Sequence, residues 1–452
     1  MSRRLKDQRQ AAIDAHRADD APAAMAAYAA YLAERPDDGS IWSNLGVLHR
    51  KAGRYDMALR AQQRAVAADP GARNVQVNLA NILSDLGRYD ESIAIRRALL
   101  VDTPNDLNQL AMIGRCLRGK GDYAGATAFL TEQVDRHPQD AELQIQLAFA
   151  QLGAGDYVPA FTHYKARWKT GELSARDQNI PEWQGESLDG KTLLVLPEQG
   201  FGDALLFARF LPVLRDIGGK VHFVCEKPLA RLFDGLSGAD HIKVGHRRAE
   251  AGDYWINMMD LALLHFERYA DVPAPVSLSV PSDSVARAKA IVAPHRDRFK
   301  VGVVWTGSET YKGNAFRSFS HRDFLPLVDV PGVQLFSLYK GPALDAYKGD
   351  GTDAFIIDTA TTDRDFADCA ATMQQMDLIV TSDTATAHLA GSLGLETWVA
   401  LHWDPFWVFS HHGDRTEWYP SIRLFRQPAP RDWDSVMAEI VDALRTRLES
   451  RV

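Results

Sequence analysis

The sequence predicts an all-α repeat region followed by an α/β region that consists of two doubly wound halves. Three observations support this prediction: a 34-residue period in the first third, short apolar runs alternating with helical patterns from about residue 190, and a break rich in Pro and Ala between two groups of runs. The 452 residues are 46% hydrophobic, enough for several cores. We expect a repeat domain over residues 1–170, a linker over 171–189, and two α/β domains over 190–285 and 286–452.

Composition excludes several classes of protein. The formal charge of -8 argues against a general nucleic-acid binder. The three cysteines, Cys116, Cys225 and Cys369, lie far apart without the spacing of a zinc site or a redox pair. No apolar run approaches the roughly 20 residues that span a bilayer. We therefore expect a cytoplasmic protein that neither enters a membrane nor binds nucleic acid.

Landmark residues recur through the first third, and each type has a structural reason. A glycine ends the first helix of each unit in a left-handed conformation, a tyrosine follows two residues later, a small residue lets two helices approach, and a proline ends the second helix. The spacing thus predicts one helix-turn-helix per period. The landmarks are Gly53, Gly87, Gly121 and Gly155; Tyr55, Tyr89, Tyr123 and Tyr157; Ala24, Ala58, Ser92, Ala126 and Ala160; and Pro36, Pro70, Pro104 and Pro138.

This pattern resembles the tetratricopeptide repeat, and WSNLG, from Trp42 to Gly46, is the most complete copy of its first-helix motif. About five units run from near residue 5 to near residue 170, and the first looks like a cap. The resemblance implies a superhelix whose concave face binds an extended peptide or a partner protein. The alternative is that the repeats only dock on the rest of the chain.

The apolar runs of the remaining chain predict buried parallel strands with helices between them. Ligands of two such halves would bind at the carboxyl ends of the strands, and an interdomain linker is expected within residues 271–295. The predicted strands are LDGKTLLVLP, KVHFVCE, KVGVVWTG, VQLFSLY, DLIVTSD and TWVALHW. The predicted helices include DALLFARFLPVLRDIG, SHRDFLPLVDV and the terminal DWDSVMAEIVDALRTRL.

The first loop with chemical potential is PEQGFGD, where Gly200 and Gly202 stand between a strand and a helix. Leu205 occupies the place of the third small residue of a dinucleotide-binding fingerprint, which disfavours a dehydrogenase. The glycines would let a substrate approach the backbone. Asp203, at the helix start, is a candidate general base. A helix cap is the alternative role for this carboxylate.

Two further loops carry groups suited to phosphate, because arginine binds two oxygens at once and lysine acts as a point charge. One is WTGSETYKGNAFR and the other follows VQLFSL at the same predicted edge of the sheet. A solvated charged loop is the alternative. The predicted binding residues are Trp305, Thr306, Gly307, Lys312, Arg317, Tyr339 and Lys340.

The stretch TSDTATAHLAGSLG places Asp383, Thr384 and Ala385 where a strand gives way to a helix. The unpaired N–H groups of a helix start can bind a diphosphate. His388 follows about one turn later and could donate to the same phosphate or to a leaving group. A core or capping histidine is the alternative.

GFGDALLFARFLP resembles the glycine-Asp loop and helix of the bacterial heptosyltransferase family, in which that aspartate is the proposed base. SDTATAHLAGSLG, followed by ALHWDP, resembles that family's Asp-Thr/Ser-Gly-x-x-His-x-x-Ala segment and its Asp-Pro loop. The resemblance covers about residues 190–430. Ala385 replaces the usual glycine, and HWDPFW is bulkier than the family's turn. Repeats fused to such a domain also resemble bacterial protein O-glycosyltransferases, including flagellin-modifying enzymes.

The resemblance implies a GT-B fold and an inverting, metal-independent glycosyltransferase that uses a nucleotide sugar as co-substrate and no cofactor. Asp203 and His388 would be catalytic, and the glycines and phosphate-binding residues named above would hold the donor. The repeats would bind a protein acceptor, with flagellin among the candidates. The alternatives are a non-catalytic scaffold with a degenerate GT-B domain and a heptosyltransferase-like enzyme acting on a glycolipid. The donor base, the sugar (heptose, hexose or nonulosonic acid) and the acceptor stay open.

Overall fold

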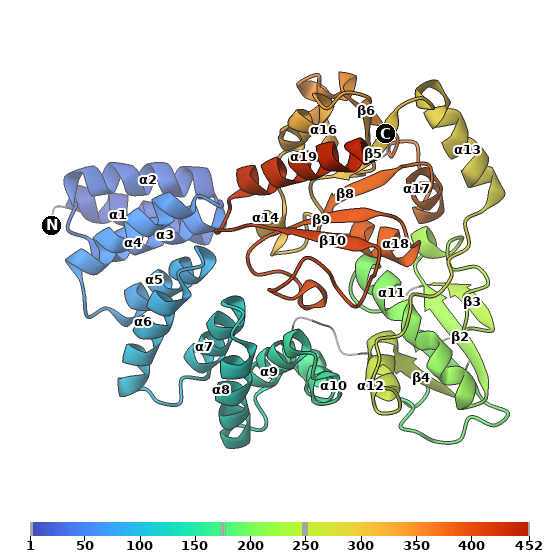
Figure 1. Ribbon diagram of the computed structural model, residues 1–452. Helices are drawn as coiled ribbons and strands as arrows, with labels where there is room; N and C mark the ends of the chain where they lie inside the picture. The colour runs from blue at the N-terminus through green and yellow to red at the C-terminus, as the bar shows by residue number, and fades with distance from the viewer. Residues whose placement is uncertain (1–2, 172, 174–175, 177, 246–251, 451–452) are drawn as a thin grey trace. The chain divides into compact units, whose positions relative to one another are not determined.

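The computed structural model describes residues 3–171, 173, 176, 178–245 and 252–450 (Figure 1). The chain forms two compact units, Met1–Ala150 and Gln151–Val452. The predicted end of the repeat domain, residue 170, therefore lies within the second unit. Residues 172, 174, 175 and 177 of the predicted linker lie outside the described residues.

The first unit consists of antiparallel helix pairs, and the last pair continues into the second unit. The predicted helix-turn-helix period is confirmed, because in every pair after the first the landmark glycine follows the first helix with a positive φ, +70° at Gly53, while Asp19 takes this conformation in the first pair, at +58°. The tyrosines two residues later begin the second helices. The helices are α1 Arg3–Arg17, α2 Ala21–Glu34, α3 Gly39–Lys51, α4 Tyr55–Ala68, α5 Arg73–Asp85, α6 Tyr89–Asp102, α7 Leu107–Gly119, α8 Tyr123–Arg136, α9 Ala141–Ala154 and α10 Tyr157–Tyr164.

The small landmark residues are fully buried, as a close helix crossing requires. Ala24, Ala58 and Ala126 have no exposed surface, and Ser92 is equally buried and donates its hydroxyl proton to the Ala80 carbonyl at 2.8 Å. The polar hydroxyl is tolerated inside the pair because that hydrogen bond satisfies it. The close contacts of these pairs form the core of the first unit.

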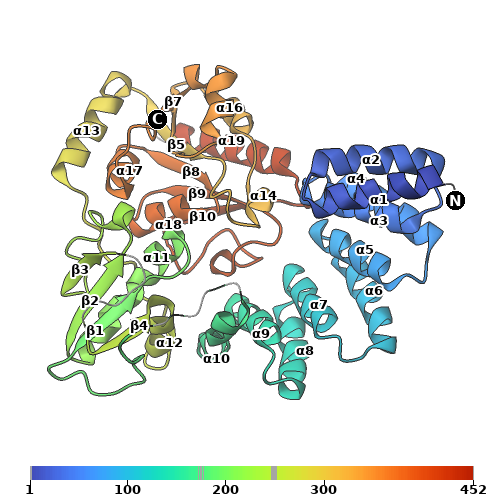
Figure 2. The same cartoon turned by 180° about the vertical axis from the view of Figure 1, so that it is seen from behind.

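The second unit contains two parallel sheets (Figures 1 and 2). The first sheet has the order β3-β2-β1-β4 and the second has the order β10-β9-β8-β5-β6-β7. All six predicted strands are present, whereas β3, β4, β7 and β10 were not predicted. The strands are β1 Thr192–Leu196, β2 Lys220–Cys225, β3 His241–Val244, β4 Tyr254–Asn257, β5 Phe299–Val304, β6 Val333–Ser337, β7 Ile356–Asp358, β8 Leu378–Ser382, β9 Thr397–Leu401 and β10 Ile422–Arg426.

In the second unit, helices alternate with strands as predicted, but one predicted helix is divided in two. The predicted helix over 203–218 is divided into α11 and the 3-10 segment η2, Ala208–Asp216, because Pro212 has no N–H to donate to the carbonyl four residues earlier. The predicted boundary at 285/286 falls inside α13, which packs on α17. The α-helices are α11 Phe201–Phe207, α12 Leu261–Phe266, α13 Ser282–Val292, α14 Asn314–Arg317, α15 Leu325–Val328, α16 Leu344–Gly349, α17 Phe366–Met373, α18 Ala385–Ser392 and α19 Trp433–Glu449.

The strand orders place three of the predicted loops where sheets of this kind bind ligands. In chain order the second sheet reads 3-2-1-4-5-6, the order of doubly wound folds that bind ligands where the winding reverses. That reversal lies between β5 and β8, and in the first sheet it lies between β1 and β4. The loops that carry Asp203, Arg317 and Asp383 follow β1, β5 and β8, so all three leave strands beside a reversal point.

Within the described residues, no helix combines the length and the apolar character that crossing a bilayer would require.

Candidate functional site

The loop after β1 bends sharply before α11 begins. Gln199 has a φ of +51°, a left-handed conformation that is uncommon for a residue with a side chain. The Gly200 N–H then donates to Oδ2 of Asp203 at 3.0 Å, which completes one side of a capping box at the start of α11. Asp203 is therefore a helix cap, which was the alternative role expected from the sequence. Oδ1 of this carboxylate is not part of the cap.

The environment of Asp203 suits a base. Protein surrounds the carboxyl on most sides although it keeps partial exposure to solvent, and this burial raises the pKa of Asp203 to about 6. The Glu198 carboxylate contributes to this raised value, whereas the Gly200 hydrogen bond and the Arg317 guanidinium oppose it. A carboxylate with a pKa near 6 is ionised at neutral pH and accepts a proton more readily than an ordinary aspartate.

Helices α11 and α18 lie side by side and bring the first and third predicted loops together (Figures 1 and 2). A Cβ atom on Gly202 would stand 3.2 Å from Cδ2 of His388 and 3.4 Å from Cα of Ala385. Thr384 is the N-cap of α18 and accepts from the Thr386 N–H at 3.3 Å. Gly202 therefore allows a close approach between two helix starts, whereas the sequence predicted that it would let a substrate approach the backbone.

His388 is buried and neutral. Burial, together with the Arg209 and Arg317 guanidinium groups, lowers its pKa to about 3. Its Nδ1 lies 3.1 Å from the Tyr419 hydroxyl, and its ring stacks on Phe409. A neutral imidazole can form a hydrogen bond with an oxygen atom but brings no positive charge. The surroundings of His388 are those of the alternative, a histidine packed in a core, and its role in a ligand pocket stays a prediction.

Arg317 is close enough to the acidic groups of the first and third loops to affect both. Its charge acts on both Asp203 and Asp383, and no carboxylate lies within 4.0 Å of its guanidinium among the described residues. The guanidinium lies over the Tyr311 ring at 4.5 Å, and its Nε donates to Oδ1 of Asn314 at 3.3 Å. A cation without an ion-pair partner in such a place can accept an anionic ligand.

Asn314 organises the loop after β5 and was not singled out from the sequence. Its side-chain amide donates to Oγ1 of Thr306 at 3.0 Å, and its Oδ1 accepts from the Gly307 N–H at 3.2 Å. A Cβ atom on Gly307 would stand 2.7 Å from Nη2 of Arg317 and 3.0 Å from Cγ2 of Thr384. Thr306 and Gly307 thus shape the loop and give the Arg317 guanidinium its space.

Asp383 is buried directly before α18. Burial raises its pKa, whereas the Arg317 guanidinium and a hydrogen bond from the Phe406 backbone lower it. Ala385, two residues later, starts the helix, as predicted. Asp383, Thr384 and Ala385 therefore lie within reach of both Arg317 and the start of α11.

Four predicted residues have other surroundings. Trp305 and Tyr339 are buried and pack on each other, with ring centroids 5.0 Å apart, so both side chains belong to the core. Their role as ligand contacts stays a prediction. The Lys340 ammonium donates to the Asp363 carbonyl, and Lys312 is exposed in the loop after β5.

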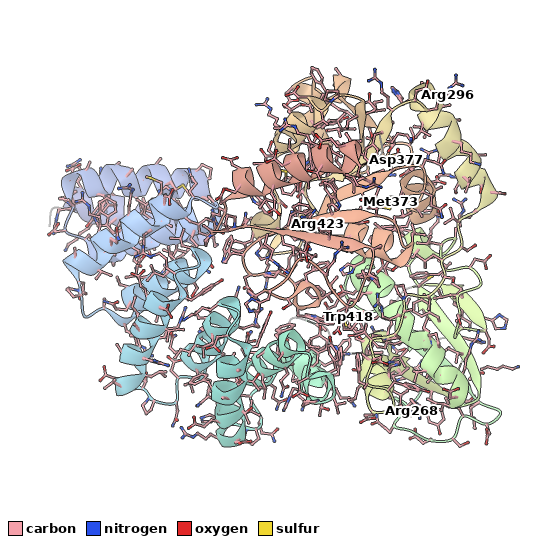
Figure 3. The ribbon with its side chains drawn as sticks, in the orientation of Figure 1. Arg268, Arg296, Met373, Asp377, Trp418 and Arg423 are labelled. Atoms are coloured by element: carbon pink, nitrogen blue, oxygen red, sulfur yellow. The ribbon has the colours of Figure 1, made fainter. Side chains whose placement is uncertain are left out.

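A buried arginine joins this site to the loop before β10. Arg209 is 2% exposed, and its Nη1 donates to the Trp418 carbonyl at 2.8 Å. Its guanidinium also lies over the Tyr419 ring, 4.5 Å from the centroid. Trp418, labelled in Figure 3, donates its indole N–H to the Tyr157 hydroxyl at 3.1 Å. No motif in the sequence points to these contacts, because they join segments about 210 and 260 residues apart.

The N-terminal sequence matches two models of the tetratricopeptide repeat, over residues 9–73 and residues 49–116. The N-terminal helices are tetratricopeptide repeats. These repeats generally mediate binding between proteins. The repeat identity agrees with the 34-residue period and with the glycine-ended helices.

Among curated proteins, the chain is similar to Protein FlbA of Caulobacter vibrioides, with 26% identity over 313 residues. The match covers 62% of this chain and 51% of FlbA, so the chain spans about half the length of the curated relative it matches.

Among solved structures, PilW, a type IV pilus biogenesis factor, covers 39% of this chain and 81% of its own at 21% identity and a TM-score of 0.34. MamA of Desulfovibrio magneticus covers 38% of this chain and 99% of its own at 15% identity and a TM-score of 0.35. A tetratricopeptide repeat protein of Parabacteroides merdae covers 37% of this chain and 67% of its own at 16% identity and a TM-score of 0.34.

Proposed function

We propose that the protein is an inverting glycosyltransferase of the GT-B type that moves a sugar from a nucleotide sugar to a Ser or Thr hydroxyl of a protein acceptor. The observation that carries the proposal is the meeting of α11 with α18, which brings the Asp203 carboxylate and the start of α18 to a shared cation, Arg317. A base on one side and an anion-binding group on the other are what a direct displacement needs.

Each group has a defined role in this reaction. Asp203 removes the proton of the acceptor hydroxyl, whose oxygen bonds to the anomeric carbon as the bond from that carbon to the phosphate oxygen breaks. Arg317 and the N–H groups at the start of α18 stabilise the negative charge on the departing diphosphate. His388, which is neutral, contributes a hydrogen bond. No metal ion is required in this scheme, and the absence of a metal requirement stays a prediction.

The repeats are the proposed acceptor-binding part. Their presence supports a protein acceptor over a glycolipid, since a glycolipid gives a protein-binding module no evident task. Flagellin is the first acceptor to examine because the fused architecture resembles flagellin-modifying enzymes. We expect donor, acceptor and enzyme to meet in the cytoplasm.

The test is intact-mass analysis of flagellin and other abundant proteins from cells with the gene, without it, and with single variants. Asp203→Asn and His388→Ala should abolish the gene-dependent mass increase. Asp323→Asn is a matched control, because Asp323 is also a capping-box acid whose pKa burial raises, at the start of the 3-10 segment η6, His321–Phe324. The control should keep the full mass increase.

The alternatives give different results. If the Asp203 and His388 variants modify proteins as the wild type does, the catalytic assignment fails and a scaffold that only binds partners is favoured. If protein masses never depend on the gene while lipopolysaccharide masses do, the acceptor is a glycolipid.

A further inference from the structure

A buried ion cluster connects the segment that follows the last repeat helix with the loop that carries the proposed base. Arg167, in the 3-10 segment η1, Lys165–Lys169, is 4% exposed. Its Nε and Nη2 donate to the two carboxylate oxygens of Glu198 at 2.8 and 2.9 Å, and Nη2 also donates to Asp260 at 2.9 Å. Glu198 accepts a further bond from the Met259 N–H at 3.2 Å. The carboxylates of Asp260 and Glu198 raise the pKa of Arg167 although burial lowers it, so the arginine stays charged.

The same loop has two more attachments to this segment. The Tyr164 hydroxyl accepts from the side-chain amide of Gln199 at 3.0 Å, and Arg176 donates to the Pro197 carbonyl. Pro197, Glu198 and Gln199 are therefore each held by a side chain from residues 164–176. Gln199 is the residue with the positive φ, and the next residue donates the N–H that fixes the Asp203 carboxylate.

We propose that Arg167 is a positioning residue that acts through Glu198, holding the turn at residues 197–200 in the conformation that aims the Asp203 carboxylate at the acceptor. The proposal rests on the proposed function and adds a part to it. The segment after the last repeat helix becomes a component of the catalytic apparatus.

Physical reasons favour a positioning role over simple attachment. A planar guanidinium that makes two parallel bonds to a carboxylate fixes the orientation of that group, whereas a lysine would restrain only its distance. Gln199, the residue after Glu198, has a left-handed backbone conformation. This conformation is unfavourable in isolation and persists only where surrounding contacts hold it in place. A displacement of about 1 Å in a catalytic group can lower a rate about a hundredfold.

Charges around Asp203 give the proposal a second signature. The groups that face it are Glu198 from its own loop, Tyr164 from α10, Arg317 from α14 and Tyr419 from the loop before β10. Only Glu198 brings a negative charge at neutral pH. Glu198→Gln removes that charge and keeps the shape, so the pKa of Asp203 should fall. The acidic limb of the rate against pH should then move to lower pH.

The experiment uses full-length purified protein and an extract of cells that lack the gene, which supplies both the donor and the acceptor. The initial rate of the acceptor mass increase is measured from pH 5 to pH 8. Arg167→Lys should lower the rate at neutral pH by about tenfold or more. The matched control is Arg447→Lys, because Arg447 also binds a glutamate, Glu396, with two nitrogens, but joins α19 to the residue before β9. The control should change the rate less than about twofold.

The outcomes separate the two levels of the proposal. If the wild type produces no mass increase, the proposed function fails and this inference falls with it. If the wild type is active and Arg167→Lys matches Arg447→Lys in rate and pH profile, only the positioning role fails. Should Arg167→Lys prove unfolded by circular dichroism, Glu198→Gln decides by its rate: this variant loses the paired bonds from Arg167, so a rate at neutral pH within about twofold of the wild type overturns the proposal.

Discussion

The Asp203 carboxylate is both the cap of α11 and the proposed base. One oxygen completes the cap of α11, and the surrounding protein raises its pKa to about 6. A cap alone would favour the ionised form and lower the pKa. The opposite shift means that desolvation outweighs the cap, so the ionised carboxylate is held at a cost in stability. Such costs are common at sites that do chemistry.

This cost predicts a pH-dependent effect of Asp203→Asn on stability. Because the pKa in the folded protein lies above that of the unfolded chain, about 3.8, the folded state binds the proton more tightly and protonation stabilises the fold. That stabilisation is complete below pH 3.8 and is lost as pH rises through about 6. At pH 7 the Asn variant should be more stable than the wild type by about 1–2 kcal/mol, after a discount for the partial exposure of the carboxyl.

Urea unfolding at several pH values measures this difference. The gap between variant and wild type should shrink as pH falls from 7 towards 4. A constant gap would mean that Asp203 has an ordinary pKa and would remove one support for its role as base.

Gly202 and Gly200 form a matched pair that tests the approach of α11 to α18. Alanine at 202 would place a methyl group 3.2 Å from the buried His388 ring, tighter than usual, whereas alanine at 200 would meet only Oδ2 of Asp203 at 3.6 Å. We expect Gly202→Ala to lower the free energy of unfolding by about 1 kcal/mol and Gly200→Ala to change it by less than about 0.5 kcal/mol. Equal effects in urea unfolding would contradict the close packing.

Helix α18 shows how an element made of small residues can hold a site in place. Gly391 lies under Tyr419, and a Cβ atom there would stand 2.5 Å from Cδ1 of that fully buried ring. Tyr419 in turn reaches Nδ1 of His388, so the packing of the helix and the orientation of the histidine depend on one contact. The glycine costs helix propensity but makes room for the ring.

We therefore expect Gly391→Ala to destabilise the protein by about 1–3 kcal/mol, because a buried ring cannot move away from the added methyl group and this overlap outweighs the gain in helix propensity. Gly349→Ala, at the end of α16 with nothing within 4 Å of its Cβ position, is the control and should be neutral or slightly stabilising. Thermal unfolding of both variants provides the comparison. A stable Gly391→Ala protein would show that Tyr419 can repack.

Elements were predictable from the sequence where a local pattern determines them. Strands such as β8, buried at every position, appear as apolar runs, whereas β3 is partly exposed along its length and has no such signal. The helix pattern over 203–218 was correct in its apolar spacing but ignored Pro212, which changes the hydrogen bonding. The period and composition of the sequence predict local structure, but they predict short edge strands poorly.

At the scale of the whole molecule, the division at residues 150 and 151 predicts which fragments fold. A chain of residues 151–452 keeps Tyr157, which stacks on Phe266 at 4.4 Å, and keeps the Arg167 pair. A chain that begins at 171 leaves Glu198 buried without its guanidinium, a loss that typically costs about 3–5 kcal/mol. We expect cooperative urea unfolding of the longer fragment and a much less stable shorter one. Equal stability would show that the compact unit begins later.

The loops of the candidate site were predictable because parallel strands deliver their following loops to one edge of a sheet. Arg317 and Asp383 come together on this rule, because β5 and β8 are neighbours in one sheet, whereas Asp203 follows β1 of the other sheet and meets them only through the packing of α11 on α18. The partners Arg167 and Glu198 were not predictable, since 31 residues separate them and the arginine follows a helix whose tyrosine matches the repeat. The burial of Trp305 and Tyr339 was not predicted either, because aromatic residues at strand ends occur both at ligand sites and inside the protein.

Tyr157 occupies the place of the landmark tyrosine in the last unit, yet its hydroxyl contacts Glu417 and accepts from Trp418, residues that no repeat supplies. A repeat array normally grows or shrinks by whole units, because each unit presents the same surface to the next. Here the final unit has lost that interchangeability. During evolution, or in the hands of a protein engineer, the number of repeats can change only among the earlier units, while the last one must be inherited together with the sheets it serves.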